Sequence, residues 1–548
     1  MQRIFKGFIA LCALLSLIGC EKRAPAQAGQ AAPQASGDAI PATGIRFLSG
    51  SENKDLYPIL QQFEKENGVK FAMTYKGSVD GMMALQKGAD TPYDFVWLAS
   101  DIWIGLGDRQ KVVKNADSIM TSPVVFGVKA SKAKELAWVN NPGVKIKDIV
   151  EAVSTHKIRF AMTSATQSNT GACATFGFYS ALSGSPEVLT QAHLNDKTMQ
   201  EQISKLLNSV NRGSGSSGFL VDDLVAHPER YDAMVNYEAL VISANQKLVA
   251  QGEEPLYVIY PADGMTVANF PLGFVSHGDA SKDVIFKKLQ TYLKSDAVQK
   301  QILAQGRRTQ ILGLKPDAVD KSVFNPAWGI DVSKTISAIT MPPSDVIKAG
   351  LELYQTSLRK PSFSIFVLDY SGSMLHNGGA EQLKAAMTLL LEPEEAKRYL
   401  LQVSPRDVTA IFPYDNKVYG PFVIKGNDPA DLRGALAQIT GDIGGGGTST
   451  HTALATALDY LVQHRNELPG YLPAVFLMTD GDATDSIAIF KTKVAELGIG
   501  RDIPIYAITF GKEVAQDKID EIIKAMSGKS FDGTQDLVGK FREVKGYN

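Results

Sequence analysis

The stretch Phe366–Met374, FVLDYSGSM, constrains the fold of this chain more than any other. An apolar run ends abruptly in three oxygen-bearing side chains, Asp369, Ser371 and Ser373, which are spaced two residues apart. In an extended segment, residues two apart point to the same side. The pattern therefore predicts a buried strand that delivers three oxygen donors to one point at its carboxyl end.

Two further oxygen donors lie in the same block of sequence. Thr448 follows the glycine run Gly444–Gly447, and Asp480 follows an apolar run in the sequence MTDGD. The block from Ser362 to Asn548 alternates strand and helix patterns, which predicts a doubly wound α/β sheet with its site at the carboxyl ends of the strands. Three hydroxyls and two carboxylates suit Mg²⁺, with Ca²⁺ or Mn²⁺ as alternatives.

This constellation resembles the von Willebrand factor type A domain with its metal-ion-dependent adhesion site (MIDAS). The resemblance implies that the hydroxyls contact the metal and that the two carboxylates act directly or through water. It also implies that a carboxylate of a protein partner fills the open coordination position. The implied metal-site residues are Asp369, Ser371, Ser373, Thr448 and Asp480.

Four other side chains near these loops are not needed for the predicted site. His376 and His451 could bind metal, but the five oxygens already account for the ligands. Asp482 and Asp485 are expected to be solvated surface charges.

The first twenty residues have the pattern of a targeting segment. Arg3 and Lys6 precede a short apolar run, Gly7–Ile18, which is too short to span a bilayer. The run ends in LIGC, which resembles the lipobox of bacterial lipoproteins. This resemblance implies that residues 1–19 are a signal peptide and that Cys20 carries the lipid. An ordinary secretory signal is the alternative.

Residues 20–44 are rich in Ala, Gln and Pro, which is typical of a flexible tether. We therefore expect an exported protein in the bacterial cell envelope, anchored by lipid and facing the periplasm or the cell exterior. Cys12 would leave with the signal peptide, so Cys173 would remain alone and is expected to be buried as a small hydrophobic residue.

Residues 45–310 also alternate strand and helix patterns, which favours a parallel sheet with ligands at the strand ends. Three successive strands end in serines, and a run of small polar residues, Ser168–Gly171, stands where a helix should start. Such a helix start suits an anion or a carbonyl oxygen. The serine-rich stretch Gly213–Gly218 is expected to be a flexible loop.

Four stretches, SPVVFGVKAS, TSATQSNTG, NYEALVIS and ANFPLGFVS, resemble type 2 periplasmic solute-binding proteins, in particular the oxyanion-binding branch. The resemblance implies two α/β lobes, joined by crossing strands at Ser122–Lys129 and Ala268–Ser276, with a solute between them. The implied cleft residues are Ser49, Ser78, Ser100, Ser168, Asn169 and Tyr237. Glu238 would repel an anion, so an amine or a peptide-like solute stays an alternative.

Residues 311–361 are expected to connect the two blocks, with a helix after Pro342-Pro343-Ser344 and with Trp328 packed on one of the blocks. No Lys/Arg-rich run stands out and the formal net charge is −2, so a nucleic-acid partner is not expected. The usual catalytic motifs are absent from the sequence, and an enzyme is not expected.

We therefore expect an exported binding protein that combines a solute-binding module with a metal-dependent protein-interaction module. A transport receptor with an accessory A-type domain is one alternative. An adhesin or assembly factor whose solute-binding fold has lost its ligand is another.

Overall fold

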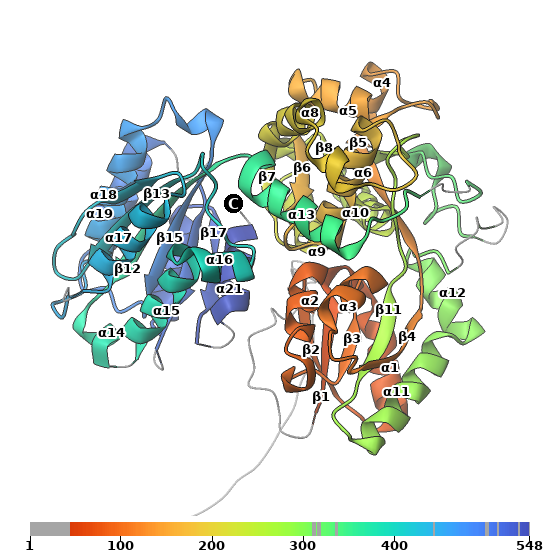
Figure 1. Ribbon diagram of the computed structural model, residues 1–548, viewed down its shortest axis with the longest axis horizontal. Coiled ribbons are helices and arrows are strands. Elements are labelled where there is room, and N and C mark those ends of the chain that lie inside the picture. The colour runs from red at the N-terminus through yellow and green to blue at the C-terminus, as the bar shows by residue number, and fades with distance from the viewer. Residues whose placement is uncertain are drawn as a thin grey trace, which may run out of the picture. The chain divides into compact units, whose positions relative to one another are not determined.

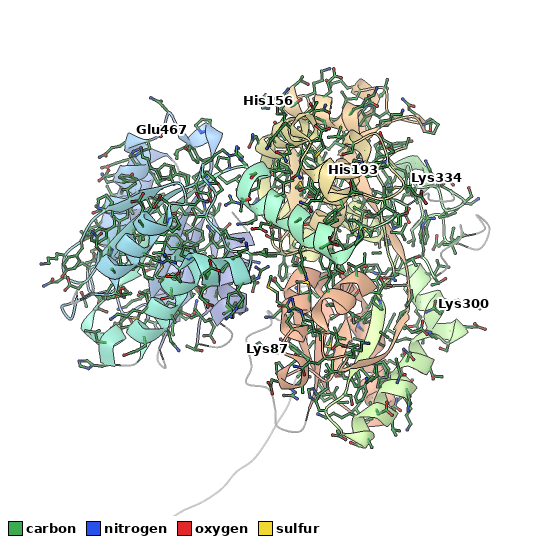
Figure 2. All side chains as sticks on the ribbon, in the orientation of Figure 1. Lys87, His156, His193, Lys300, Lys334 and Glu467 are labelled. Atoms are coloured by element: carbon green, nitrogen blue, oxygen red, sulfur yellow. The ribbon has the colours of Figure 1, made fainter. Side chains whose placement is uncertain are left out.

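The computed structural model describes residues 44–309, 314, 319–334, 338–376, 378–441, 444–498, 503–511, 514–534 and 537–546. The predicted signal peptide, Cys20 and the tether up to residue 43 lie outside these residues. None of the described helices is both long enough and apolar enough to cross a bilayer. Charged side chains such as Lys87, His156 and Lys300 are exposed (Figure 2).

The first lobe is built on a sheet with the strand order β2-β1-β3-β11-β4. Strands β1, β2 and β3 are parallel, whereas β11 runs antiparallel to both of its neighbours. Its elements are β1 (Ile45–Gly50), α1 (Tyr57–Asn67), β2 (Phe71–Lys76), α2 (Ser78–Leu85), β3 (Phe95–Trp97), α3 (Asp101–Gly107), β4 (Val113–Ser118), β11 (Pro271–Val275), α11 (Ala280–Leu293) and α12 (Asp296–Ala304).

The second lobe has the strand order β10-β5-β8-β6-β7, with β9 also paired to β5. Its strands are β5 (Ser122–Lys129), β6 (Phe160–Thr163), β7 (Val210–Ser214), β8 (Ala233–Tyr237), β9 (Leu256–Ile259) and β10 (Val267–Ala268). Its helices are α4 (Ala130–Glu135), α5 (Ile146–Ser154), α6 (Asn169–Leu182), α7 (Gln191–Leu194), α8 (Lys197–Asn208), α9 (Ser217–Ala226) and α10 (Glu238–Ala250).

The chain crosses between the lobes in the short segments 119–121 and 269–270, where Ile119 N donates to Phe270 O. The second crossing lies inside the predicted range Ala268–Ser276, because Ala268 pairs in the second lobe and β11 pairs in the first. The first crossing lies just before its predicted range, because β5 pairs with β8 and β9 along its length and so lies wholly in the second lobe. The apolar runs chosen as crossings are strands that are buried inside each lobe.

The connector packs on the second lobe. Trp328 belongs to the same hydrophobic core as the two lobes. Helix α13 (Ser344–Leu353) lies against α6, where Tyr179 OH donates to Gly350 O at 2.9 Å. A π-helical turn, Tyr354–Leu358, then leads into the next domain.

The C-terminal domain has the strand order β14-β13-β12-β15-β16-β17, and all neighbours are parallel except β14. Its strands are β12 (Ser362–Asp369), β13 (Val408–Tyr414), β14 (Phe422–Lys425), β15 (Leu472–Thr479), β16 (Ile505–Thr509) and β17 (Gly528–Asp532). Its helices are α14 (Gly372–His376), α15 (Gly379–Leu391), α16 (Pro393–Arg398), α17 (Pro429–Ile439), α18 (Thr450–Gln463), α19 (Ile487–Leu497), α20 (Gln516–Ala525) and α21 (Leu537–Gly546).

Strand β12 shows why this sheet is doubly wound. Its side chains alternate between two hydrophobic cores: Phe363, Ile365 and Val367 face one core, and Phe366 and Leu368 face the other. Helices α18 and α19 cover one face of the sheet, and α15, α16 and α21 cover the other (Figure 1). Because both faces are buried, the strand is a continuous apolar run from Ile365 to Leu368, directly before Asp369.

Candidate functional sites

The carboxyl ends of β12 and β15 form the switch point of the C-terminal sheet. Strand β13, the next along the chain, pairs with one edge of β12, and the later strand β15 pairs with the other edge. The loops after β12 and β15 therefore leave in opposite directions, which opens a crevice between them. Asp369 ends β12 and Asp480 directly follows β15, so both carboxylates lie at this crevice.

Asp369 is held rigidly at the end of its strand. Its Oδ1 accepts from Ser371 N at 2.9 Å, and its Oδ2 accepts from Thr479 Oγ1 at 2.6 Å. The hydroxyls of Ser371 and Ser373 lie 3.1 Å apart. The spacing of two therefore places both hydroxyls at one point beside the carboxylate.

The loop that carries Thr448 is joined to the loop after β12. Gly445 N donates to Tyr370 O at 2.8 Å, and Gly372 N donates to Gly446 O at 3.0 Å. At Gly444 the backbone has φ +95°, and a Cβ there would lie 2.2 Å from Tyr370 O. Only glycine permits this approach. It brings the buried Thr448 to the same edge as Asp369.

Two carboxylates are buried close together at this edge. Asp369 and Asp480 are each almost fully shielded from solvent. Loss of hydration raises the pKa of Asp369 to about 6, and the neighbouring negative charge of Asp480 also raises it. A cation between such groups would relieve both effects.

The donor set fits a hard divalent cation. Among the described residues, no group of three or more His, Cys, Asp or Glu side chains could hold a metal ion. A metal at this edge would therefore rest on the hydroxyls as well as on the carboxylates. Oxygen-only ligands suit Mg²⁺.

Asp485 is not the solvated surface charge that the sequence analysis expected. Its carboxylate accepts from Thr452 N at 2.7 Å and from His451 N at 3.1 Å, so it caps the start of α18. The buried imidazole of His451 contacts the same carboxylate through Nδ1 at 2.8 Å. In contrast, Asp482 is exposed and pairs with Lys518, and His376 is exposed on α14.

In the solute-binding block, loops from the two lobes touch each other. Ser51, just after β1, hydrogen-bonds through its hydroxyl to the hydroxyl of Ser216 in the second lobe. Val79 N donates to Gln167 O at 3.0 Å. Both β1 and β6 are the strands at which the order of their sheets reverses, so these loops occupy the positions where α/β folds bind ligands.

Of the predicted cleft residues, Asn169 and Tyr237 are hydrogen-bonded to each other, and Ser168 lies in the same region. Asn169 links the lobes, because its Oδ1 accepts from Trp103 Nε1 at 2.6 Å while its Nδ2 donates to Tyr237 OH at 2.9 Å. Ser168 hydrogen-bonds with Ser217 at 2.9 Å. Ser216 and Ser217 are buried, and α9 begins at Ser217, so this part of the stretch Gly213–Gly218 is not the flexible loop that was expected.

Ser49, Ser78 and Ser100 are hydrogen-bonded within the first lobe. Ser49 Oγ accepts from Asn53 Nδ2 at 3.1 Å, and Ser78 Oγ accepts from Ala99 N at 3.1 Å. Ser100 caps α3 by accepting from Ile102 N at 3.3 Å. These hydroxyls accept hydrogen bonds within their own loops. Their predicted contact with a solute stays a prediction.

The doubt that Glu238 raised is resolved by an ion pair. Arg308 donates to both oxygens of Glu238 at 2.7 Å, and Tyr260 OH also donates to this carboxylate. All three side chains are buried. Glu238 therefore joins the segment after α12 to the second lobe and does not need a solute as its partner.

The sequence reasoning missed two acceptors in the loop after β1. Glu52 Oε1 and Asn53 Oδ1 are buried, and neither has a hydrogen-bond partner among the described residues. Burial raises the pKa of Glu52 to about 7 because the carboxylate loses its hydration. The signal was available, since two polar residues directly follow the strand-end serine.

A third missed residue comes from the C-terminal helix. Arg542 Nε donates to Asp80 Oδ1 of the first lobe at 2.5 Å, and Arg542 Nη2 donates to Thr166 O of the second lobe at 2.5 Å. Gln167 donates its side-chain amide to the carbonyl of Arg542. One buried guanidinium on α21 therefore contacts both lobes, which no local pattern of sequence could predict.

Two family models match the chain. Residues 46–308 match the bacterial extracellular solute-binding protein, and residues 365–540 match the von Willebrand factor type A domain. The chain is thus a fusion of these two domains, as the sequence resemblances predicted. No curated protein matches the chain significantly.

Solved structures similar to the chain include several binding proteins. The sulfate-binding protein SubI from Mycobacterium tuberculosis is 16% identical, with 55% of this chain and 94% of that chain covered and a TM-score of 0.39. The periplasmic binding protein AfuA from Actinobacillus pleuropneumoniae, with fructose-6-phosphate bound, is 11% identical, with 57% and 98% covered and a TM-score of 0.41. The ferric binding protein from Campylobacter jejuni is 13% identical, with 57% and 98% covered and a TM-score of 0.40.

Proposed function

Because the chain joins a bacterial extracellular solute-binding domain to a von Willebrand factor type A domain, we propose that it is an exported binding protein with two kinds of ligand. The first domain takes a small solute between its lobes. The second grips a protein partner through Mg²⁺. Lipid on Cys20 holds the protein at a bacterial membrane, and neither domain acts as an enzyme.

The observation that carries the metal-dependent part is the pair of buried carboxylates at the switch point of the second sheet. Asp369 and Asp480 lie close enough that the charge of one raises the pKa of the other. Ser371, Ser373 and Thr448 supply hydroxyls at the same edge. These five residues would hold Mg²⁺, which would supply an open coordination position for an acidic side chain of a partner.

Native mass spectrometry of the full chain tests this part with a matched pair of variants. Asp480→Ala removes a proposed ligand, whereas Asp482→Ala removes an exposed carboxylate two residues away. We expect the parent and Asp482→Ala to retain one divalent ion when Mg²⁺ is supplied, and Asp480→Ala to lose it. Equal metal retention in all three proteins would overturn the proposed site.

Two buried acceptors without a partner among the described residues indicate that the solute carries hydrogen-bond donors. Glu52 Oε1 and Asn53 Oδ1 would each need a hydrogen-bond donor when the lobes close. An amine or a polyhydroxyl solute supplies donors, whereas a fully ionised oxyanion supplies none. We therefore favour a donor-bearing solute over the oxyanion that the sequence resemblance suggested.

A ligand screen by thermal shift distinguishes the two solute classes. Amines and polyols should raise the unfolding temperature of the parent but not of Asn53→Ala, which removes the unpaired Oδ1 acceptor. Stabilisation by divalent oxyanions alone, lost in Asn169→Ala, would reverse the preference. If neither class of compound raises the unfolding temperature, the adhesin or assembly alternative is favoured. The direct hydrogen bonds between the lobes are also consistent with that alternative.

A further inference from the structure

A cavity of about 60 Å³ lies beside the connector. It is bordered by the loop after β6 in the second lobe, by the π-helical turn, by the first residues of β12 and β15, and by α21. The polar residues that line it include Ser164, Thr166, Gln355, Lys360, Ser362 and Lys545. It therefore lies at the amino ends of β12 and β15, at the opposite end of the strands from the proposed metal site.

Three of the lining side chains are cationic, and one of them is neutralised. Arg359 donates to Asp407 through both terminal nitrogens, one of them at 3.1 Å. The same carboxylate accepts from Ser362 N and from Ser404 N, each at 2.8 Å. Both oxygens of Asp407 are thus hydrogen-bonded, and its ion pair among the described residues is with Arg359.

The other two cations, Lys360 and Lys545, have no carboxylate partner among the described residues. The Lys545 ammonium has only a 3.4 Å contact with Ser364 Oγ and lies 5.6 Å from the ring centre of Phe476. The surrounding protein lowers the pKa of Lys545 to about 8, and it also lowers the pKa of Lys360, because the ammonium groups lose hydration. Asp407 also acts on Lys545 electrostatically, but at a distance. Two poorly hydrated ammonium groups that form no ion pair with a described carboxylate therefore border one small cavity.

The size of the cavity suits a compact anion. A water molecule needs about 10–15 Å³ of such space, so the cavity holds about four waters. The four oxygens of a tetrahedral oxyanion need similar room. The hydroxyl of Ser362 borders the same space and can donate to the anion, as can the second amide hydrogen of Gln355, whose Nε2 also donates to Gln402 O at 2.8 Å. The hydroxyls of Ser164 and Thr166 also border it and hydrogen-bond with each other at 3.0 Å.

We propose that this cavity is an anion site that binds a tetrahedral oxyanion of the phosphate or sulfate class between Lys360 and Lys545. Lys360 comes from the connector and Lys545 from the last helix, while Ser164 and Thr166 come from the second lobe. The bound anion therefore fastens the A-type domain to the solute-binding domain. This site is separate from the solute position between the lobes and from the metal edge.

Inorganic phosphate tests the proposal with the full chain at pH 7. We expect phosphate to raise the unfolding temperature of the parent, relative to sodium chloride at equal ionic strength. Lys545→Met and Lys360→Met each keep the aliphatic stem and remove the charge, and each should weaken phosphate binding at least tenfold by calorimetry. Lys540→Met, on an outward part of the same helix beside Glu543, should bind as the parent does.

Binding between the lobes would give a different pattern. If Asn169→Ala loses phosphate binding while both lysine variants keep it, the anion sits between the lobes and the proposal fails. It also fails if the parent shows no response to phosphate or sulfate beyond that to chloride. Because two independent lysines are tested, misfolding of one variant leaves the other to decide.

Discussion

The proposed metal edge of the A-type domain, which carries Asp369 and Asp480, and the contact between the two lobes both lie at points where the strand order of a sheet reverses. They differ in whether their polar groups have partners of opposite character. At the metal edge, two carboxylates are brought together although their charges repel. Between the lobes, most polar groups already have protein partners, such as Asn169 with Trp103 and Tyr237. The first arrangement concentrates like charges, whereas the second pairs most of its polar groups and leaves a few acceptors, such as Glu52 Oε1, without a partner among the described residues.

The largest loss of stability is expected at Glu238, which belongs to neither of these two sites. Glu238→Ala should lower the free energy of unfolding of the solute-binding domain by about 3–5 kcal/mol, because Arg308 would remain buried without a counter-charge. Urea unfolding followed by tryptophan fluorescence measures this loss. The exposed Glu253→Ala is the control, with an expected change within about 0.5 kcal/mol. Equal losses in both variants would mean that the ion pair contributes nothing.

The next prediction concerns how the free energy of unfolding depends on pH through Glu52, which lies between the lobes. Glu52 has a pKa of about 7 when folded and near 4.5 when unfolded, so the folded state binds the proton more tightly. Its contribution to stability is therefore full below pH 4.5 and is lost as the pH rises through 7, by roughly 3 kcal/mol in total. Glu52→Gln should remove this part of the pH dependence, as measured by urea unfolding between pH 4 and pH 8.

The exposed Glu66→Gln is the matched control for this pH series, and its profile should follow that of the parent. A parent whose stability is flat over this range would show that Glu52 is hydrated or paired in solution. In that case the argument for a donor-bearing solute would lose its main support.

The smallest effect tests the repulsion at the metal edge directly. Without divalent ions, Asp480→Asn should stabilise the A-type domain by about 1 kcal/mol, because one of two neighbouring buried charges is removed. The same variant should lose the stabilisation that Mg²⁺ gives to the parent. Calorimetry in EDTA and then in Mg²⁺ measures both effects. Asp482→Asn should match the parent, and destabilisation of Asp480→Asn in EDTA would contradict the repulsion.

The two regions also differ in how far the sequence predicts them. The metal edge was predictable because most of its donors stand directly at strand ends, and spacing alone brings Asp369, Ser371 and Ser373 together. That these residues bind metal stays a prediction. The α/β class was predictable for the same reason, since periodicity is a local property. The two-domain fusion was predicted from the resemblance of each block to a known family.

The solute-binding region depended on contacts between distant segments, and there the sequence reasoning was weaker. Glu238 was suspected as a solute contact because its partner Arg308 lies 70 residues away. Asp485 was taken as surface charge because the capped helix α18 precedes it by more than 30 residues. The first crossing was misplaced because a buried strand and a crossing strand have the same apolar pattern.

Strand β12 runs from the cavity beside the connector, which Ser362 borders, to the edge of the sheet that carries Asp369. Its eight residues cover roughly 23 Å at about 3.3 Å per residue. Hydrogen bonds to β13 and β15 hold it on both sides, so it cannot slide along its axis without breaking both ladders. A displacement at the amino end of β12 would therefore be carried by the sheet as a whole, and the spacing of the oxygen atoms of Asp369, Ser371 and Asp480 at the other end would stay unchanged.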